Sequence, residues 1–137
     1  MASLLAVPVR AAIAQAAPGD DGVTIGVMTD MSGVLSDLSG LGSLEAVRMA
    51  VEDAGGKALG KPVTILDIDH QNKADIAAAK ANEWFDVQNV DIITDLTNSS
   101  VALAVINVAE RKKRIAVVNG AGATRITNDS CTPYSIH

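Results

Sequence analysis

The chain has few of the residues that build disulfides and metal sites. Its 137 residues include one cysteine, Cys131, and two histidines, His70 and His137. A single cysteine excludes a disulfide within the chain, and so few sulfur and imidazole ligands give little support to a zinc site or to Cys–His catalysis. Two interpretations of Cys131 stay open: a free buried thiol, or a thiol whose partner lies in sequence outside this chain. We therefore expect neither a metal nor a cofactor.

Aromatic residues and basic clusters are also scarce. The three aromatic residues are Trp84, Phe85 and Tyr134, which we expect to pack in the core or on the surface instead of lining a ligand. The formal net charge is −5, and the longest basic run is residues 111–114, at the end of a predicted helix where cations complement the helix dipole. Such a charge pattern excludes nucleic acid as the expected partner. No apolar run reaches the length of a membrane span.

Residues 1–22 differ from the rest of the chain. Small and apolar residues lead to Ala14-Gln15-Ala16, an A-x-A pattern typical of signal-peptidase cleavage, and a polar stretch follows it. Arg10 interrupts the apolar stretch, which favours a shortened signal peptide, with a mature chain that begins near Ala17 in the periplasm. The alternative is a disordered N-terminal extension.

Residues 23–137 alternate apolar β-type runs with helical spacing and form one expected domain. Strands are predicted at residues 23–28, 63–68, 90–94 and 115–118, with a fifth starting near the C-terminal residue, and three helices lie between them. This alternation predicts an α/β fold, an open parallel sheet with helices covering both faces and strand order 2-1-3-4-5. Asn72 and Asp75 resemble a capping box at the start of the second helix.

Small polar residues follow the third predicted strand. Asn98 or Ser99 can cap the helix that begins there, because a short side-chain oxygen accepts a hydrogen bond from a first-turn N–H. A helix N-terminus with spare N–H donors also suits an anion such as a carboxylate. In an open α/β sheet, ligands gather at such corners. Capping without any ligand is the alternative.

The catalytic patterns are incomplete. Residues 40–45 begin like a dinucleotide fingerprint but carry Glu45 at the third glycine, and no P-loop or G-x-S-x-G motif occurs. A receiver-like domain phosphorylated on Asp95 is the alternative function, with Asp30 as its acid and Thr124 as its hydroxyl. It lacks a lysine after Lys113 to neutralise the phosphoryl group.

The pair Asp69 and His70, with Asp67 on the same strand, contains oxygen and imidazole groups that metals accept. We expect Asp69 and His70 to cap the sheet edge or bond to the adjacent loops instead.

Seven stretches of the chain together form a family pattern: residues 23–27, 31–33, 42–56, 69–75 (D-H-Q-N-K-A-D), 98–105 (N-S-S-V-A-L-A-V), 119–127 (N-G-A-G-A-T-R-I-T) and 131–137. They resemble the periplasmic solute-binding proteins of branched-chain amino-acid ABC transporters. The D-H-Q-N-K and C-x-P blocks look most like the branch whose ligands include aromatic acids and amides.

This resemblance implies a non-enzymatic, two-lobed protein that closes on a small-molecule ligand and delivers it to a membrane permease. The chain would supply the first lobe only, as a fragment or as the product of a truncated gene, and a non-functional remnant is a further alternative. The implied ligand is an amino acid or a small aromatic acid or amide. By the family pattern, the ligand-binding residues are Ser36, Asn98, Ser99, Ala121, Ala123 and Thr124. Leu35 stands where relatives often carry tyrosine.

Overall fold

The computed structural model describes residues 22–137. The proposed signal peptide, residues 1–22, therefore lies outside the described residues except for Gly22. The elements in chain order are β1 (Val23–Thr29), α1 (Gly40–Asp53), β2 (Lys57–Ala58), β3 (Lys61–Asp69), α2 (Ala74–Asp86), β4 (Ile92–Thr94), α3 (Ser99–Lys112), β5 (Ile115–Val117), the 3-10 helix η1 (Thr124–Ile126) and β6 (Ser135–Ile136).

The described strands form one sheet in the order β2-β3-β1-β4-β5-β6. The pairs β1–β3, β1–β4, β4–β5 and β5–β6 are all parallel, so the predicted order 2-1-3-4-5 is confirmed for the five main strands. The short strand β2 was not predicted. It pairs antiparallel with the start of β3 through a tight turn at Leu59 and Gly60, both of which have positive φ.

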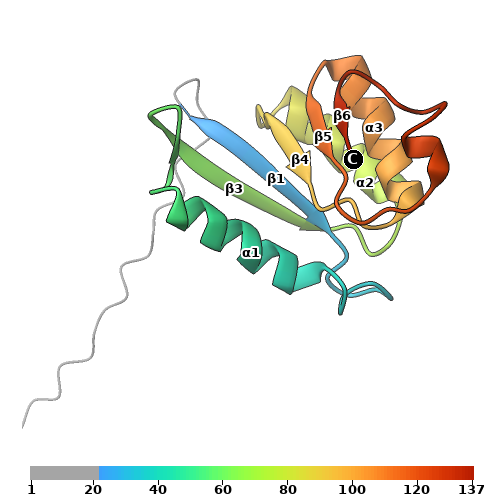
Figure 1. Cartoon of the computed structure of the whole chain (residues 1–137), viewed down its shortest axis with the longest axis horizontal. Coiled ribbons are helices and arrows are strands. Elements are labelled where there is room, and N and C mark those ends of the chain that lie inside the picture. The colour runs from blue at the N-terminus through green and yellow to red at the C-terminus, as the bar shows by residue number, and fades with distance from the viewer. Residues whose placement is uncertain (1–21) are drawn as a thin grey trace, which may run out of the picture.

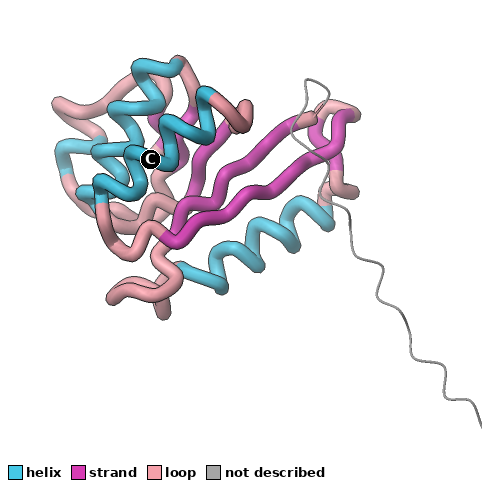
Figure 2. The backbone as a smooth tube through the Cα atoms, turned by 180° about the vertical axis from the view of Figure 1, so that it is seen from behind, coloured by secondary structure: helices cyan, strands magenta, loops and turns pink. Residues whose placement is uncertain are grey.

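Helices lie on both faces of the sheet. Figures 1 and 2 show α1 on one side of β1 and β3, and α2 and α3 together on the other side. The main core forms between α2, α3 and the sheet, and includes Met28, Trp84, Ile93 and Val105. A Cβ at Gly26 would lie 2.4 Å from Cζ3 of Trp84, so only glycine lets the indole ring pack directly on β1.

Helices on both faces confirm the predicted fold class, although α1 covers its own face of the sheet only in part. α1 packs on β1 and β3. Beyond it, an open apolar groove of about 360 Å³ is lined by α1 and by the exposed side of β4 and β5, including Val51, Ile92 and Val117. A single helix is too narrow to shield five strands, so this side of β4 and β5 stays open.

Both ends of α3 carry the residue types that stabilise helix ends: a capping side chain at the N-terminus and basic residues at the C-terminus. Asn98 is the N-cap, and its side chain accepts hydrogen bonds from the N–H groups of Ser100 and Val101, which confirms the predicted cap. At the other end, the basic run is used in ion pairs: Lys112 Nζ lies 2.7 Å from Asp86 Oδ2 and Arg114 Nη1 lies 3.0 Å from Asp91 Oδ1.

The predicted capping box at Asn72 and Asp75 is wrong. The N-cap of α2 is Lys73, and its side chain makes no capping hydrogen bond. Asn72 has φ +57° and lies in the preceding turn, where its side-chain oxygen accepts from Asn98 Nδ2. A contact between two distant loops has displaced a local capping bond.

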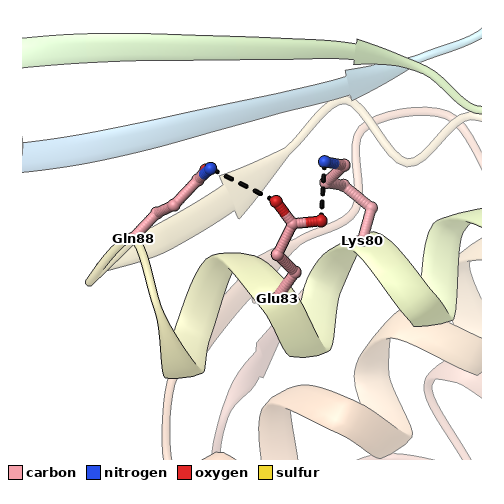
Figure 3. Close-up of polar contacts among 3 residues, drawn as sticks. All are labelled: Lys80, Glu83 and Gln88. Atoms are coloured by element: carbon pink, nitrogen blue, oxygen red, sulfur yellow. Dashed lines mark hydrogen bonds and ion pairs between the residues drawn. The ribbon is translucent and has the colours of Figure 1, made fainter.

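The turn after α2 is held by a carboxylate on the helix surface (Figure 3). Glu83 accepts one hydrogen bond from Lys80 Nζ at 2.8 Å and another from Gln88 Nε2 at 3.3 Å. Lys80 comes from the same helix and Gln88 from the turn beyond it, so the glutamate links the end of α2 to the segment that leads into β4.

Two further features concern surface chemistry. Cys131 is free and exposed, so the expectation of a buried thiol is wrong. Within residues 22–137, no helix combines the length and the hydropathy that crossing a membrane requires.

Candidate functional site

The loop between β1 and α1 is held by two carboxylates at the carboxyl end of the sheet. Asp30 is fully buried, and its two oxygens accept from the N–H groups of Gly33 and Leu35 at 2.8 and 2.9 Å. Asp69, at the end of β3, accepts from the N–H of Met31 and from the hydroxyl of Ser32. The loop, seen beyond the end of β1 in Figure 1, is therefore tied to two strands at once.

The pKa values of Asp69 and His70 are both lowered, for different reasons. Partial burial alone would raise the pKa of Asp69, but hydrogen bonds from Ser32, Gln71 and Met31 to the carboxylate lower it below its ordinary value. Burial lowers the pKa of His70, and the neighbouring carboxylates of Asp30, Asp69 and Asp95 oppose that effect. Both residues thus bond to or face the adjacent loops, as predicted from the sequence.

The N-terminus of α3 is the second corner. Asn98 has its side-chain oxygen occupied by first-turn N–H groups and one amide hydrogen used by Asn72, which leaves its second amide hydrogen available. Within the described residues, no group accepts a hydrogen bond from the N–H of Ser99. The corner is half-buried at Asn98 and Ser99 and still offers donors to an anion.

The third corner follows β5. The N–H of Ala123 donates to Ser99 Oγ at 3.2 Å, which joins this loop to the start of α3. The hydroxyl of Ser99 accepts that bond and keeps its own hydrogen for another acceptor. The carbonyl of Ala121 contacts Nε2 of His137 at 2.6 Å, so it is engaged within the protein.

The other two predicted ligand-binding residues, Ser36 and Thr124, make no side-chain hydrogen bond to the corner at Asn98 and Ser99 in the described part of the chain. Thr124 begins η1, and its exposed hydroxyl makes no hydrogen bond within the described residues. Ser36 lies in the β1–α1 loop, where its N–H donates to the carbonyl of Gly33 and its side chain is half-buried. The structure therefore brings Asn98, Ser99 and Ala123 together, while no hydrogen bond among the described residues links Ser36 to them.

Sequence reasoning did not select two residues that hold this site together. Asn119 accepts from the hydroxyl of Thr94 and from the N–H of Asp95, which fixes the β5 loop against the β4 loop. Asn72 links the β3 loop to Asn98. Both residues come shortly after a predicted strand, and this position could have identified them from the sequence. The carboxyl ends of neighbouring parallel strands meet at one edge of a sheet, so residues there lie close together.

The alternative receiver-like site is not supported by the geometry of Asp95. Its side chain is 5% exposed, and Oδ2 is buried. A phosphoryl acceptor needs an oxygen that the donor can reach in line, and this oxygen is closed off from solvent.

Comparison with protein families decides the identity of the fold. A family model described as periplasmic binding protein matches residues 22–137, which is most of the chain. The chain belongs to the periplasmic binding protein family. No curated protein matches it.

Solved structures of this family resemble the chain closely. A periplasmic binding protein from Burkholderia mallei is 52% identical over 87% of this chain and 32% of its own, with a TM-score of 0.84. A branched chain amino acid ABC transporter periplasmic ligand-binding protein from Burkholderia xenovorans is 48% identical over 84% of this chain and 31% of its own, with a TM-score of 0.80.

A third solved structure shows one ligand of a more distant relative. It is a solute binding protein of an ABC transporter from R. palustris in complex with 4-hydroxybenzoate, 26% identical over 85% of this chain and 31% of its own, with a TM-score of 0.75. The chain spans about a third of the length of these solved relatives. Two of them are named as binding proteins of ABC transporters.

Proposed function

We propose that this chain is the first lobe of the substrate-binding component of an ABC transporter, one that takes up amino acids or small aromatic carboxylates or amides. The family match and the relatives named as branched-chain amino-acid and 4-hydroxybenzoate binders support this class of ligand. The partner of the whole protein would be the membrane permease of the transporter.

The observation that carries the proposal is the 3.2 Å hydrogen bond from the Ala123 N–H to Ser99 Oγ. It brings together two loops that follow different strands, so hydroxyl and backbone donors converge at the N-terminus of α3. A carboxylate placed there would accept from the Ser99 hydroxyl and N–H and gain from the helix dipole. Ala121 and Thr124 would line the same side, and Ser36 would cover the ligand from the β1–α1 loop.

Titration of the labelled chain by NMR tests this site. With isoleucine, benzoate or 4-hydroxybenzoate as probe, the amide signals of Ser99, Ala123 and Thr124 should shift first. Ser99→Ala should raise the dissociation constant about tenfold, because it removes one hydrogen bond to a charged group. Asn107→Ala, at an exposed position two turns along α3 from the corner, is the control. Shifts that gather elsewhere, or equal weakening by both variants, would contradict the proposed site.

We also propose a periplasmic location, reached through the segment that ends in Ala14-Gln15-Ala16. The family to which the chain belongs is periplasmic by description, and the A-x-A pattern supports a cleavage site. A periplasmic fraction should yield a chain that starts near Ala17. N-terminal sequencing that recovers intact Met1 from cells would contradict cleavage.

A further inference from the structure

Two buried polar atoms in the described part of the chain have no hydrogen-bond partner, Nε2 of His70 and Oδ2 of Asp95. The His70 side chain is completely buried and Asp95 is 5% exposed. Buried polar atoms in native proteins are almost always paired, because an unpaired one costs its full desolvation energy. The two atoms can share one hydrogen-bonded link only if one of them is a donor and the other an acceptor.

The tautomer of His70 supplies the donor. Its Nδ1 accepts a hydrogen bond from the N–H of Asn72 at 3.0 Å, so a neutral imidazole carries its proton on Nε2. Burial favours this neutral form, since it lowers the pKa of His70. The buried ring thus presents an N–H group where an acceptor is needed.

Asp95 is the acceptor with an oxygen to spare. Three carboxylates act on the charge of His70: Asp30 from the end of β1, its neighbour Asp69 on β3, and Asp95 from the end of β4. Both oxygens of Asp30 and both oxygens of Asp69 already accept hydrogen bonds from the β1–α1 loop or the turn after β3. Oδ2 of Asp95 alone has none.

We infer that one buried water molecule joins His70 Nε2–H to the Asp95 carboxylate, and that this link positions the N-terminus of α3. A bridging water is nearly as good as a direct hydrogen bond. The link would run parallel to the Asn72–Asn98 hydrogen bond, which joins the same two loops. His70 and Asp95 would then be positioning residues for the corner at Ser99.

The backbone at Asp95 shows why such a link is needed. Asp95 has φ +66°, a conformation that non-glycine residues rarely adopt and that the surroundings must hold. It lies three residues before the cap Asn98, and its other oxygen accepts from the hydroxyl of Thr97 at 3.4 Å. A side chain anchored to His70 would keep this strained turn, and with it the first turn of α3, in one arrangement.

Nitrogen NMR of the labelled chain tests the link without any ligand. The chain has only two histidines, so His137→Asn assigns the signals of His70. In the native chain the neutral ring should carry its proton on Nε2. Asp95→Asn should lower the pKa of His70 by about 1, because it removes one of the charges that favour the protonated ring. Asp75→Asn, an exposed acid in the first turn of α2, is the control and should leave that pKa unchanged.

Hydrogen exchange tests the positioning role. In Asp95→Ala, the amides of Ser100 and Val101 should exchange about fivefold faster, the effect of losing one hydrogen bond that orders the turn. Asp75→Ala should not change them. A proton on Nδ1, equal His70 pKa values in Asp95→Asn and Asp75→Asn, or unchanged exchange in Asp95→Ala would each overturn the inference. Because no probe ligand is used, these outcomes are independent of whether the proposed transport ligand binds.

Discussion

At the scale of the residue, glycine decides how closely the main core can pack. Gly26 faces the indole of Trp84, and an added Cβ would meet Cζ3 and Cε3 at 2.4 and 2.6 Å. Gly42 in α1 has no heavy atom within 4 Å of the same added atom. An added methyl group would therefore clash with Trp84 at Gly26, whereas it would meet open space at Gly42.

Gly26→Ala should lower the free energy of unfolding by about 1–3 kcal/mol, because the core around Trp84 is overpacked. Gly42→Ala, at an open position in a helix, should raise it by about 0.5–1 kcal/mol through the lower helix propensity of glycine. Urea denaturation followed by Trp84 fluorescence measures both. Destabilisation of similar size in the two variants would mean that close contact with Trp84 is not the cause.

Single residues also show where sequence reasoning stopped. The cap Asn98 was predictable because capping is local: its oxygen reaches N–H groups two and three residues ahead. The role of Asn72 was not, because its partner Asn98 lies 26 residues away. A buried thiol was one of the two interpretations of Cys131, because free cysteines are usually buried. In the structure Cys131 is exposed and lies in a loop outside the core.

At the scale of the element, α3 organises the candidate site. Its N-terminus carries Asn98, Ser99 and the bond to Ala123, and one side of the helix buries Val101, Val105 and Val108 against the sheet. The spacing of those valines made this element predictable from sequence. The short strand β2 was unpredictable for the converse reason, since two residues are too few to show alternation.

Asn98→Ala should destabilise the chain by about 1–2 kcal/mol, because it leaves the N–H groups of Ser100 and Val101 without their cap. It also removes the bond to Asn72. Asn107→Ala is the matched control within the same helix: Asn107 is exposed and its amide bonds only to the carbonyl of Leu103, so alanine should be neutral or slightly stabilising. Thermal unfolding by circular dichroism compares them, and equal losses would show that the cap contributes nothing specific.

At the scale of the whole molecule, the sheet order and the presence of helices on both faces were predictable from the sequence, while the groove beside α1 was not. Regular alternation of strands and helices leaves few arrangements of a parallel sheet, and the right-handed crossover narrows them further. How far α1 extends over β4 and β5 depends on the angle at which the helix crosses the sheet. The spacing of apolar residues within α1 does not determine that angle. The result is an apolar groove lined by Ile25, Ile92 and Val117.

The chain is much shorter than its solved relatives, and this difference in length determines the ligand affinity that we expect. A ligand held by a two-lobed protein is enclosed, so each lobe supplies part of the contact and water is expelled on closure. The chain spans about a third of the length of those relatives, and its corner at Ser99 is open to solvent on one side. Each missing contact to a charged group is worth roughly 1.5–3 kcal/mol, and about 1.4 kcal/mol is tenfold in affinity.

The 137-residue chain should therefore bind isoleucine, benzoate or 4-hydroxybenzoate only in the millimolar range or more weakly. Isothermal titration calorimetry of the isolated chain measures this directly. The loss arises from absent contacts and not from a damaged corner, so the weak binding that remains should still depend on Ser99. Micromolar binding by the chain alone would mean that one lobe holds a complete site, and the two-lobed mechanism proposed for this family member would be wrong.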